Sequence, residues 1–156
     1  MSDLRIPDRW VIEDNEKKES VFDTDFYSDV LVNQGSLNSD YEDHPQILSR
    51  WATLSELCED YATRMKDELK RVDSSLDIMI REDLIQGGIK PTEKKVEKTI
   101  LMRPEYVQQL DKYNASKLQS GLAKRAMECI MSRKDMLIGL GANYRAEGQS
   151  TFRLNN

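Results

Sequence analysis

Hydrophobic residues recur every three or four positions along most of the chain after residue 45, which is the spacing of one face of an α-helix. The first stripe consists of Ile47, Trp51, Leu54, Cys58, Tyr61, Met65, Leu69, Val72, Leu76 and Met79. Its alternating steps of three and four, with one extra step of four, predict a coiled-coil-like helix with a stutter. Pro45 suits the first position of this helix, and Gly87-Gly88 followed by Pro91 suits its end. We therefore expect a first arm over about 45–86.

A second stripe follows, made of Val107, Leu110, Leu118, Leu122, Ala126, Cys129, Met136 and Leu140, with Arg133 interrupting it. Thr92 is a suitable N-cap for this arm, and Arg103-Pro104 predicts a kink or restart because proline restricts the residue before it. We expect the second arm over about 92–147, a helical hairpin over 45–148 and a polar tail over 149–156. The predicted fold is mainly α, a long antiparallel coiled-coil-like hairpin with a kink near Pro104.

Residues 1–44 have a broken pattern in which short apolar clusters such as Trp10-Val11-Ile12 and Val21-Phe22 are separated by acidic and polar residues. Such clusters can dock or add a strand but cannot form a core alone. We expect an acidic, partly ordered segment that packs on the hairpin. The alternative is a segment that binds a partner or masks a basic groove.

When two helices bury only one narrow face each, the buried apolar area is small and stabilises the pair only modestly. Further apolar residues lie off the stripes: Leu57, Ile78, Ile80, Tyr106, Tyr113, Met127, Ile130 and Leu137. They favour a homo-oligomer of hairpins over a monomer covered by residues 1–44. The residues expected to hold the oligomer together are Trp51, Leu118, Leu122, Met136 and Leu140.

The composition of the 156 residues, 33% charged and 38% hydrophobic, favours an elongated or assembling helical protein over an enzyme with a deep pocket. No apolar run suggests a membrane span or a signal peptide, so we expect a soluble, cytoplasmic protein. Cys58 and Cys129 form no paired motif and are expected to be reduced, buried residues. His44 has no nucleophile signature beside it and is expected to cap a helix or lie exposed. No enzyme activity, cofactor or metal site is predicted.

Charge is distributed unevenly along the chain. Residues 1–44 contain 4 Lys/Arg and 12 Asp/Glu (a balance of -8), residues 45–88 contain 6 and 9 (-3), and residues 89–156 contain 13 and 7 (+6), which gives the net charge of -5. Such a chain can attract a polyanion at one end. Basic side chains near Tyr106 or Tyr113, such as Lys117 and Lys124 with Arg133 or Lys134, could line a track for single-stranded nucleic acid. In an isolated chain the same pattern favours a solvated helix face, and repetition around a ring of subunits would favour the track.

Several stretches of the chain resemble a known protein family. The stretch from Ala126 to Leu140, preceded by Tyr113 and closed by Arg145-Ala146-Glu147-Gly148, resembles the C-terminal helix of phage UvsY-type recombination mediators. Glu93-Lys94 with Lys98-Thr99-Ile100-Leu101, Arg50-Trp51 and Val21-Phe22-Asp23 are similar to earlier parts of that family. The resemblance implies a ring-forming protein without enzyme activity. It would bind single-stranded DNA and help a RecA-like recombinase displace single-strand-binding protein.

One departure from the family bears on the binding site. The family has a basic pair late in its first long helix, whereas this chain has Asp73-Ser74-Ser75-Leu76-Asp77 there. Any DNA contact must therefore come from other residues. The candidates are Lys66, Lys70, Arg71, Lys90, Lys94, Lys95 and Lys98.

Two other classes of function remain open from the sequence. One is a phage structural or assembly protein that uses the hairpin for packing and binds no DNA. The other is an adaptor that binds a protein partner through its acidic segment. Oligonucleotide binding that weakens with salt distinguishes the mediator from both.

Overall fold

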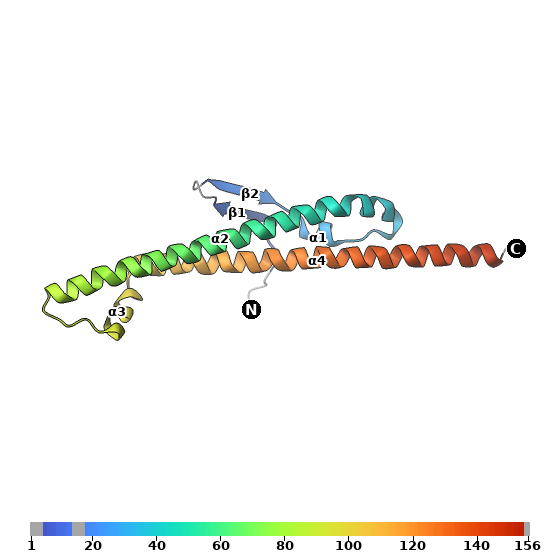
Figure 1. The fold of residues 1–156 in the computed structure, drawn as a ribbon. Coiled ribbons are helices and arrows are strands. Elements are labelled where there is room, and N and C mark those ends of the chain that lie inside the picture. Colours follow the sequence, from blue (N-terminus) through green and yellow to red (C-terminus); the bar gives the residue numbers. More distant parts are fainter. Residues whose placement is uncertain (1–4, 14–17, 155–156) are drawn as a thin grey trace. The chain divides into compact units, whose positions relative to one another are not determined.

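The structure is a computed structural model that describes residues 5–13 and 18–154, with side chains up to Ala146. Its elements are β1 (Arg9–Glu13), β2 (Glu19–Asp23), α1 (Phe26–Val30), a short 3-10 helix η1 (Gln34–Ser36), α2 (Leu37–Gln86), α3 (Glu93–Ile100) and α4 (Pro104–Leu154) (Figure 1). The predicted mainly helical hairpin is confirmed. None of the described helices is both long and apolar enough to span a lipid bilayer.

The chain divides into two compact units. Unit 1 contains Met1–Leu57 and Gly121–Asn156, and unit 2 contains Cys58–Ser120. In both units a segment of α2 packs against a segment of α4. Unit 1 adds β1, β2, α1 and η1 to these segments, and unit 2 adds α3.

In unit 1, residues before α2 form part of the core. β1 and β2 pair antiparallel, with Trp10 opposite Phe22 and Val11 opposite Val21. Trp10 and Trp51 are both fully buried, and their rings meet edge to face with centroids 6.2 Å apart. Phe26 contacts Trp51 in the same manner at 5.8 Å. Because aromatic pairs contribute beyond their buried area, this cluster fixes the N-terminal segment on α2.

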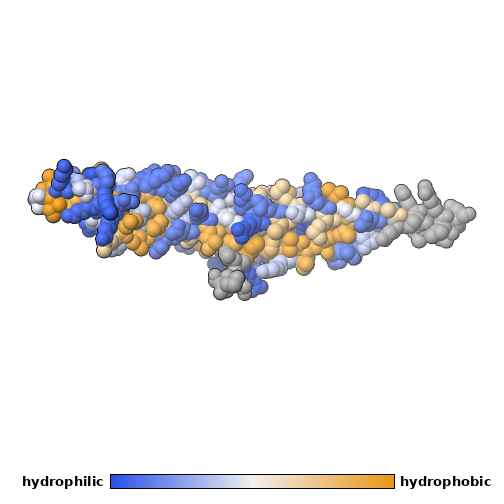
Figure 2. Space-filling view, turned by 90° about the horizontal axis from the view of Figure 1, so that it is seen from below, coloured by the Kyte–Doolittle hydropathy of each residue, from blue (hydrophilic) through white to orange (hydrophobic). Residues whose placement is uncertain are grey.

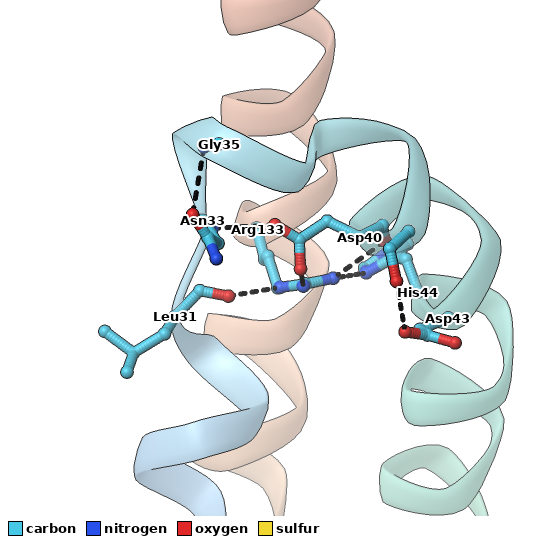
Figure 3. A network of polar contacts seen from close by, with 8 residues as sticks. Leu31, Asn33, Gly35, Asp40, Asp43, His44 and Arg133 are labelled. Atoms are coloured by element: carbon cyan, nitrogen blue, oxygen red, sulfur yellow. Dashed lines mark hydrogen bonds and ion pairs between the residues drawn. The ribbon is translucent and has the colours of Figure 1, made fainter.

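A buried arginine links the same segment to α4 (Figure 3). Arg133 is only 2% exposed, and its Nε donates to the carbonyl oxygen of Leu31 at 2.9 Å. Its Nη2 pairs with Asp40 Oδ1 at 2.6 Å, and its Nη1 donates to the Asp40 carbonyl oxygen at 3.3 Å. Close by, Tyr41 Oη donates to the carbonyl oxygen of Leu137 at 2.6 Å. These contacts satisfy the buried guanidinium, as a charge removed from water requires.

Several sequence predictions about α2 need correction. The helix begins at Leu37 rather than at Pro45, which lies inside it. An internal proline costs about 3 kcal/mol because a backbone hydrogen bond is lost. The contacts of Asp40 and Tyr41 with α4 stabilise the preceding turns and offset this cost. The predicted stripe otherwise holds, except that Ile80 is buried and Met79 is 41% exposed.

The buried face of α4 differs more from its prediction. It consists of Gln109, Ser116, Ala123, Ala126, Ile130, Arg133 and Leu137. Of the predicted stripe, only Ala126 is buried, while Leu118 and Met136 are more than half exposed. Small residues let the helices approach closely, and Arg133 belongs to the buried face instead of interrupting it. Cys129, expected to be buried, is exposed, whereas Cys58 is buried as predicted.

The helix boundaries around α3 agree with the sequence. α2 ends at Gln86, Thr92 occupies the N-cap position of α3 without a side-chain capping bond, and Pro104 is the first residue of α4. The other end of α4 differs, because the helix continues to Leu154 through most of the predicted polar tail. Residues 155–156 of that predicted tail lie outside the described part of the chain.

Candidate nucleic-acid interface

The candidate interface lies in unit 2, where a hydrophobic cluster fixes the short helix α3. Val96 and Ile100 of α3 are buried against Leu76 and Ile80 of α2. Val72, Leu84 and Tyr106 complete this cluster from its edges. Since Val96 and Ile100 are four residues apart, they lie on the same face of α3 and orient the helix.

The turn before α3 depends on the backbone conformation of Gly88. Gly88 has a φ of 68°, a conformation that favours glycine. Its N–H donates to the carbonyl oxygen of Ile85 at 3.0 Å, and the N–H of Ile89 donates to that of Leu84 at 2.8 Å. This pair of bonds is a Schellman motif, which satisfies the last carbonyls of α2. Gly87-Gly88 therefore ends the helix, as the sequence indicates.

The lysines of α3 lie away from the buried face. At about 100° per residue, Lys94 and Lys98 lie opposite the Val96 and Ile100 side, and Lys95 lies on a flank. All three are exposed, and so is Lys90 in the preceding turn. These four lysines make no ion pair with any residue that the structure describes. Their charges are therefore available to an anionic partner.

The other flank of α3 is acidic. A pocket is lined by Asp73, Asp77, Glu93 and Glu97 together with Ile100, Leu101 and Tyr106. Asp73 and Asp77 belong to α2, and Glu93 and Glu97 belong to α3. This part of the surface repels phosphate, so a bound strand would have to follow the lysine side of α3.

Arg81 joins this acidic flank to α2. Its Nε and Nη2 contact the two oxygens of Asp77 at 2.6 and 3.0 Å, and its Nη2 also contacts Glu93 Oε2 at 2.8 Å. The hydrogen bond from Arg81 lowers the pKa of Asp77. Bonds to Asp77 and Glu93 in turn raise the pKa of Arg81. Arg81 therefore positions α3 and is not a free cation for a ligand.

The second predicted cluster is less coherent. Lys66 and Lys70 are four residues apart and lie on one side of α2, whereas Arg71 points about 100° away from Lys70. All three are exposed. Lys70 Nζ pairs with Asp67 Oδ1 at 3.0 Å, and this bond lowers the pKa of Asp67. Because one charge is already paired, this cluster is the weaker candidate.

The basic residues suggested along α4 differ in their exposure. Arg133 is committed to Leu31 and Asp40 in unit 1 and cannot contact a phosphate. Lys117 and Lys124 are both exposed. His44, expected to cap a helix or lie exposed, is instead buried inside α2 beside Arg133. No sequence signal marked His44 and Arg133 as partners, apart from their positions at helical spacing within inward-facing stripes.

The residues predicted to mediate oligomerisation fall into two groups. Trp51 is fully buried within unit 1, and its Nε1 donates to Asp29 Oδ2 at 2.9 Å, so it has no surface to offer to another chain. Leu118 is 54% exposed and Met136 is 57% exposed, while Leu122 and Leu140 are half-buried. Figure 2 shows hydrophobic side chains at the surface in patches between hydrophilic ones. Association of chains through α4 stays a prediction.

Within the part of the chain that the structure describes, no group of three or more His, Cys, Asp or Glu side chains is placed to hold a metal ion. Burial raises the pKa of the Cys58 thiol to about 11, which keeps it protonated and unreactive near neutral pH.

Comparison with family models, curated proteins and solved structures gives no match.

Proposed function

We propose that this protein binds single-stranded DNA through the exposed lysines of α3 and acts as a recombination mediator. The observation that carries the proposal is the outward placement of Lys94, Lys95 and Lys98 on a helix fixed by Val96 and Ile100. Because α3 is already fixed, little backbone entropy is lost when its lysines bind phosphates. Each lysine that neutralises a phosphate also releases counterions from the nucleic acid, which favours binding.

The mediator role depends on the resemblance to UvsY-type proteins in the sequence. In that role the chain has no enzyme activity and acts through its partners. These are single-stranded DNA, a RecA-like recombinase and single-strand-binding protein. A ring of identical chains would repeat the lysines of α3 around its circumference, and repetition turns a modest cluster into a continuous track.

The test is to change Lys94, Lys95 and Lys98 together to Gln and measure binding of a labelled single-stranded oligonucleotide at several salt concentrations. Glutamine keeps helix propensity close to that of lysine, so circular dichroism should stay unchanged. Affinity should fall, and the log-log salt slope should become shallower by about 2 if each lysine neutralises one phosphate, at about 0.7 per contact.

A matched variant carries the same change in charge on α2: Lys66, Lys70 and Arg71 to Gln. We expect a smaller loss of affinity, because Lys70 is already paired and Arg71 points elsewhere. If the α2 variant loses the binding and the α3 variant does not, the interface is on α2. If both bind like the unmodified protein, the proposal is wrong.

A second candidate function is a helical assembly component that binds no DNA. It is favoured by the exposed apolar residues of α4, among them Leu118, Met131, Met136 and Ile138. Exposed apolar side chains that gather into a patch mark surfaces that contact other proteins. Changing Leu118 and Leu122 to Asp should lower the mass measured by sedimentation under either function, whereas only the mediator shifts an oligonucleotide.

A further inference from the structure

His44 lies at the point where the residues before α2 meet α4 (Figure 3). It is the only histidine of the chain and is 7% exposed. Its Nδ1 is 3.3 Å from Nη1 of Arg133, the side chain that also holds Leu31 and Asp40. One guanidinium thus connects the imidazole to Leu31, which precedes α2, and to Asp40 in the first turn of α2.

The chemistry of this contact determines the protonation state of His44. Arginine is a donor only, so Nδ1 must accept, and a neutral imidazole then carries its proton on Nε2. Nε2 is buried and has no hydrogen-bond partner among the described residues. Protonation would place a second N–H at Nδ1, directed at the N–H groups of Arg133. The contact would change from a hydrogen bond to a repulsion between two cations.

The cations beside His44, which are Arg133 and Lys134 of α4, oppose its protonation as well. The carboxylates of Asp40 and Asp43 on α2 act in the opposite direction, but each already has a partner. Asp40 is bonded to Arg133, and Asp43 accepts from Ser39 Oγ at 3.3 Å. The segment from Leu31 to Ser36 adds only a backbone carbonyl to the contact and no titratable side chain. Burial, followed by the charges of Arg133 and Lys134, lowers the pKa of His44.

We propose that the contact of residues 31–44 with α4 is a pH-sensitive clasp, which opens when His44 takes up a proton. The proposal is independent of DNA binding. Because Arg133 joins Leu31, Asp40 and His44, its displacement by a charged imidazole loosens all three contacts together.

The direction of the pH effect follows from linkage. The pKa of His44 is lower in the folded protein than its ordinary value of 6.5, so the unfolded or open state binds the proton more tightly. The stability contributed by neutral His44 is complete above pH 6.5 and is lost as pH falls from there through the folded pKa. Carboxylates of ordinary pKa titrate at about pH 4. The effect of His44 can therefore be separated from the effect of the carboxylates by their pH ranges.

The single histidine makes the test direct, since the spectrum contains one imidazole C2–H resonance. Its chemical shift and the tryptophan emission are followed in the unmodified protein from pH 8 to pH 4.5. Trp10 and Trp51 are buried in unit 1 and report on its opening. We expect a titration midpoint below 6.5 and a red shift of the emission over the same range. A midpoint at or above 6.5, or emission that stays constant while the imidazole titrates, would overturn the proposal.

A variant separates His44 from the carboxylates. Asn at position 44 keeps an acceptor near the place of Nδ1 but cannot take up the proton, so His44→Asn should lose the emission change above about pH 5. His44→Gln is the alternative if the asparagine variant is poorly folded at neutral pH. An acid transition that persists unchanged in a folded variant would assign the opening to carboxylates and contradict the clasp.

Discussion

Units 1 and 2 are held together by different kinds of contact. Unit 1 uses an aromatic cluster around Trp51 and the buried Arg133. Unit 2 packs α3 on α2 through an aliphatic cluster around Ile80 and Ile100, with Tyr106 of α4 and the partly exposed ion pairs of Arg81 at its edge. Aliphatic contacts tolerate changes of shape, whereas a buried charge requires each of its partners. We therefore expect single side-chain substitutions to lower the stability of unit 1 more than that of unit 2. In unit 2 we expect stability to depend more on the backbone conformation of the turn at Gly87-Gly88.

The largest expected effect is that of Trp51→Ala. This substitution empties the space between Trp10 and Phe26 and should lower the free energy of unfolding by about 3–5 kcal/mol. Urea denaturation followed by circular dichroism measures the change. Leu57→Ala is the control on the same helix, because Leu57 is 37% exposed and should cost far less. Equal losses in the two variants would contradict the role of the aromatic cluster.

Arg133→Lys should have the next largest effect. Lysine keeps the charge but has a single nitrogen, which cannot serve Leu31, Asp40 and His44 together. Loss of charged hydrogen bonds should cost about 1.5–3 kcal/mol. Arg125→Lys, at an exposed position of the same helix, should stay within about 0.5 kcal/mol of the unmodified protein in the same denaturation experiment. If Arg133→Lys leaves the free energy of unfolding unchanged, the positive charge alone is enough to hold Leu31, Asp40 and His44 on α4.

A contrast between α2 and α4 explains how much of each buried face the sequence could predict. The stripe of α2 contains large apolar residues, so its helical spacing identified the buried face from Trp51 to Leu76. The buried face of α4 includes Ser116, Ala123 and Arg133, which carry little hydrophobic signal. Periodicity therefore selected larger side chains such as Leu118 and Met136, which are exposed.

Helix ends were predictable only where local chemistry decides them. Gly88 and Pro104 end and begin helices through their own backbone properties, and both boundaries were found in the sequence. Pro45 was misleading because contacts of Asp40 and Tyr41 with α4, more than 90 residues away, stabilise the helix on its N-terminal side. The lysines of the candidate site were identified from charge, but the acidic flank beside them depends on how α3 packs.

In unit 2, Gly88→Ala tests the turn. An alanine at a φ of 68° is strained, and the variant should lose about 1–2 kcal/mol. Gly87→Ala is the matched control, because its Cβ would make an ordinary contact of 3.4 Å with the Asp83 carbonyl oxygen and its φ is not positive. Thermal unfolding of the two variants should differ clearly. Equal midpoints would show that the left-handed conformation is not required.

The smallest expected effects come from two glycines of α4, and their difference reports on the polar contacts of unit 1. An added Cβ at Gly139 meets nothing within 4 Å, so Gly139→Ala should stabilise the helix by about 0.5–1 kcal/mol. At Gly141 the added Cβ would lie 2.9 Å from Tyr41 Oη, which donates to the Leu137 carbonyl oxygen. Tyr41 must then move, and the loss of its bond should cancel or exceed the gain in helix propensity.

Thermal unfolding of Gly139→Ala and Gly141→Ala measures this difference, with the double variant Tyr41→Phe/Gly141→Ala as a further control. Without its hydroxyl, the ring at position 41 leaves more room for the new methyl group, so Gly141→Ala should be less harmful on the Tyr41→Phe background than alone. If Gly139→Ala and Gly141→Ala raise the midpoint equally, the contact of Tyr41 with α4 contributes nothing to unit 1. Its stability would then rest on Trp51 and Arg133 alone among the contacts tested.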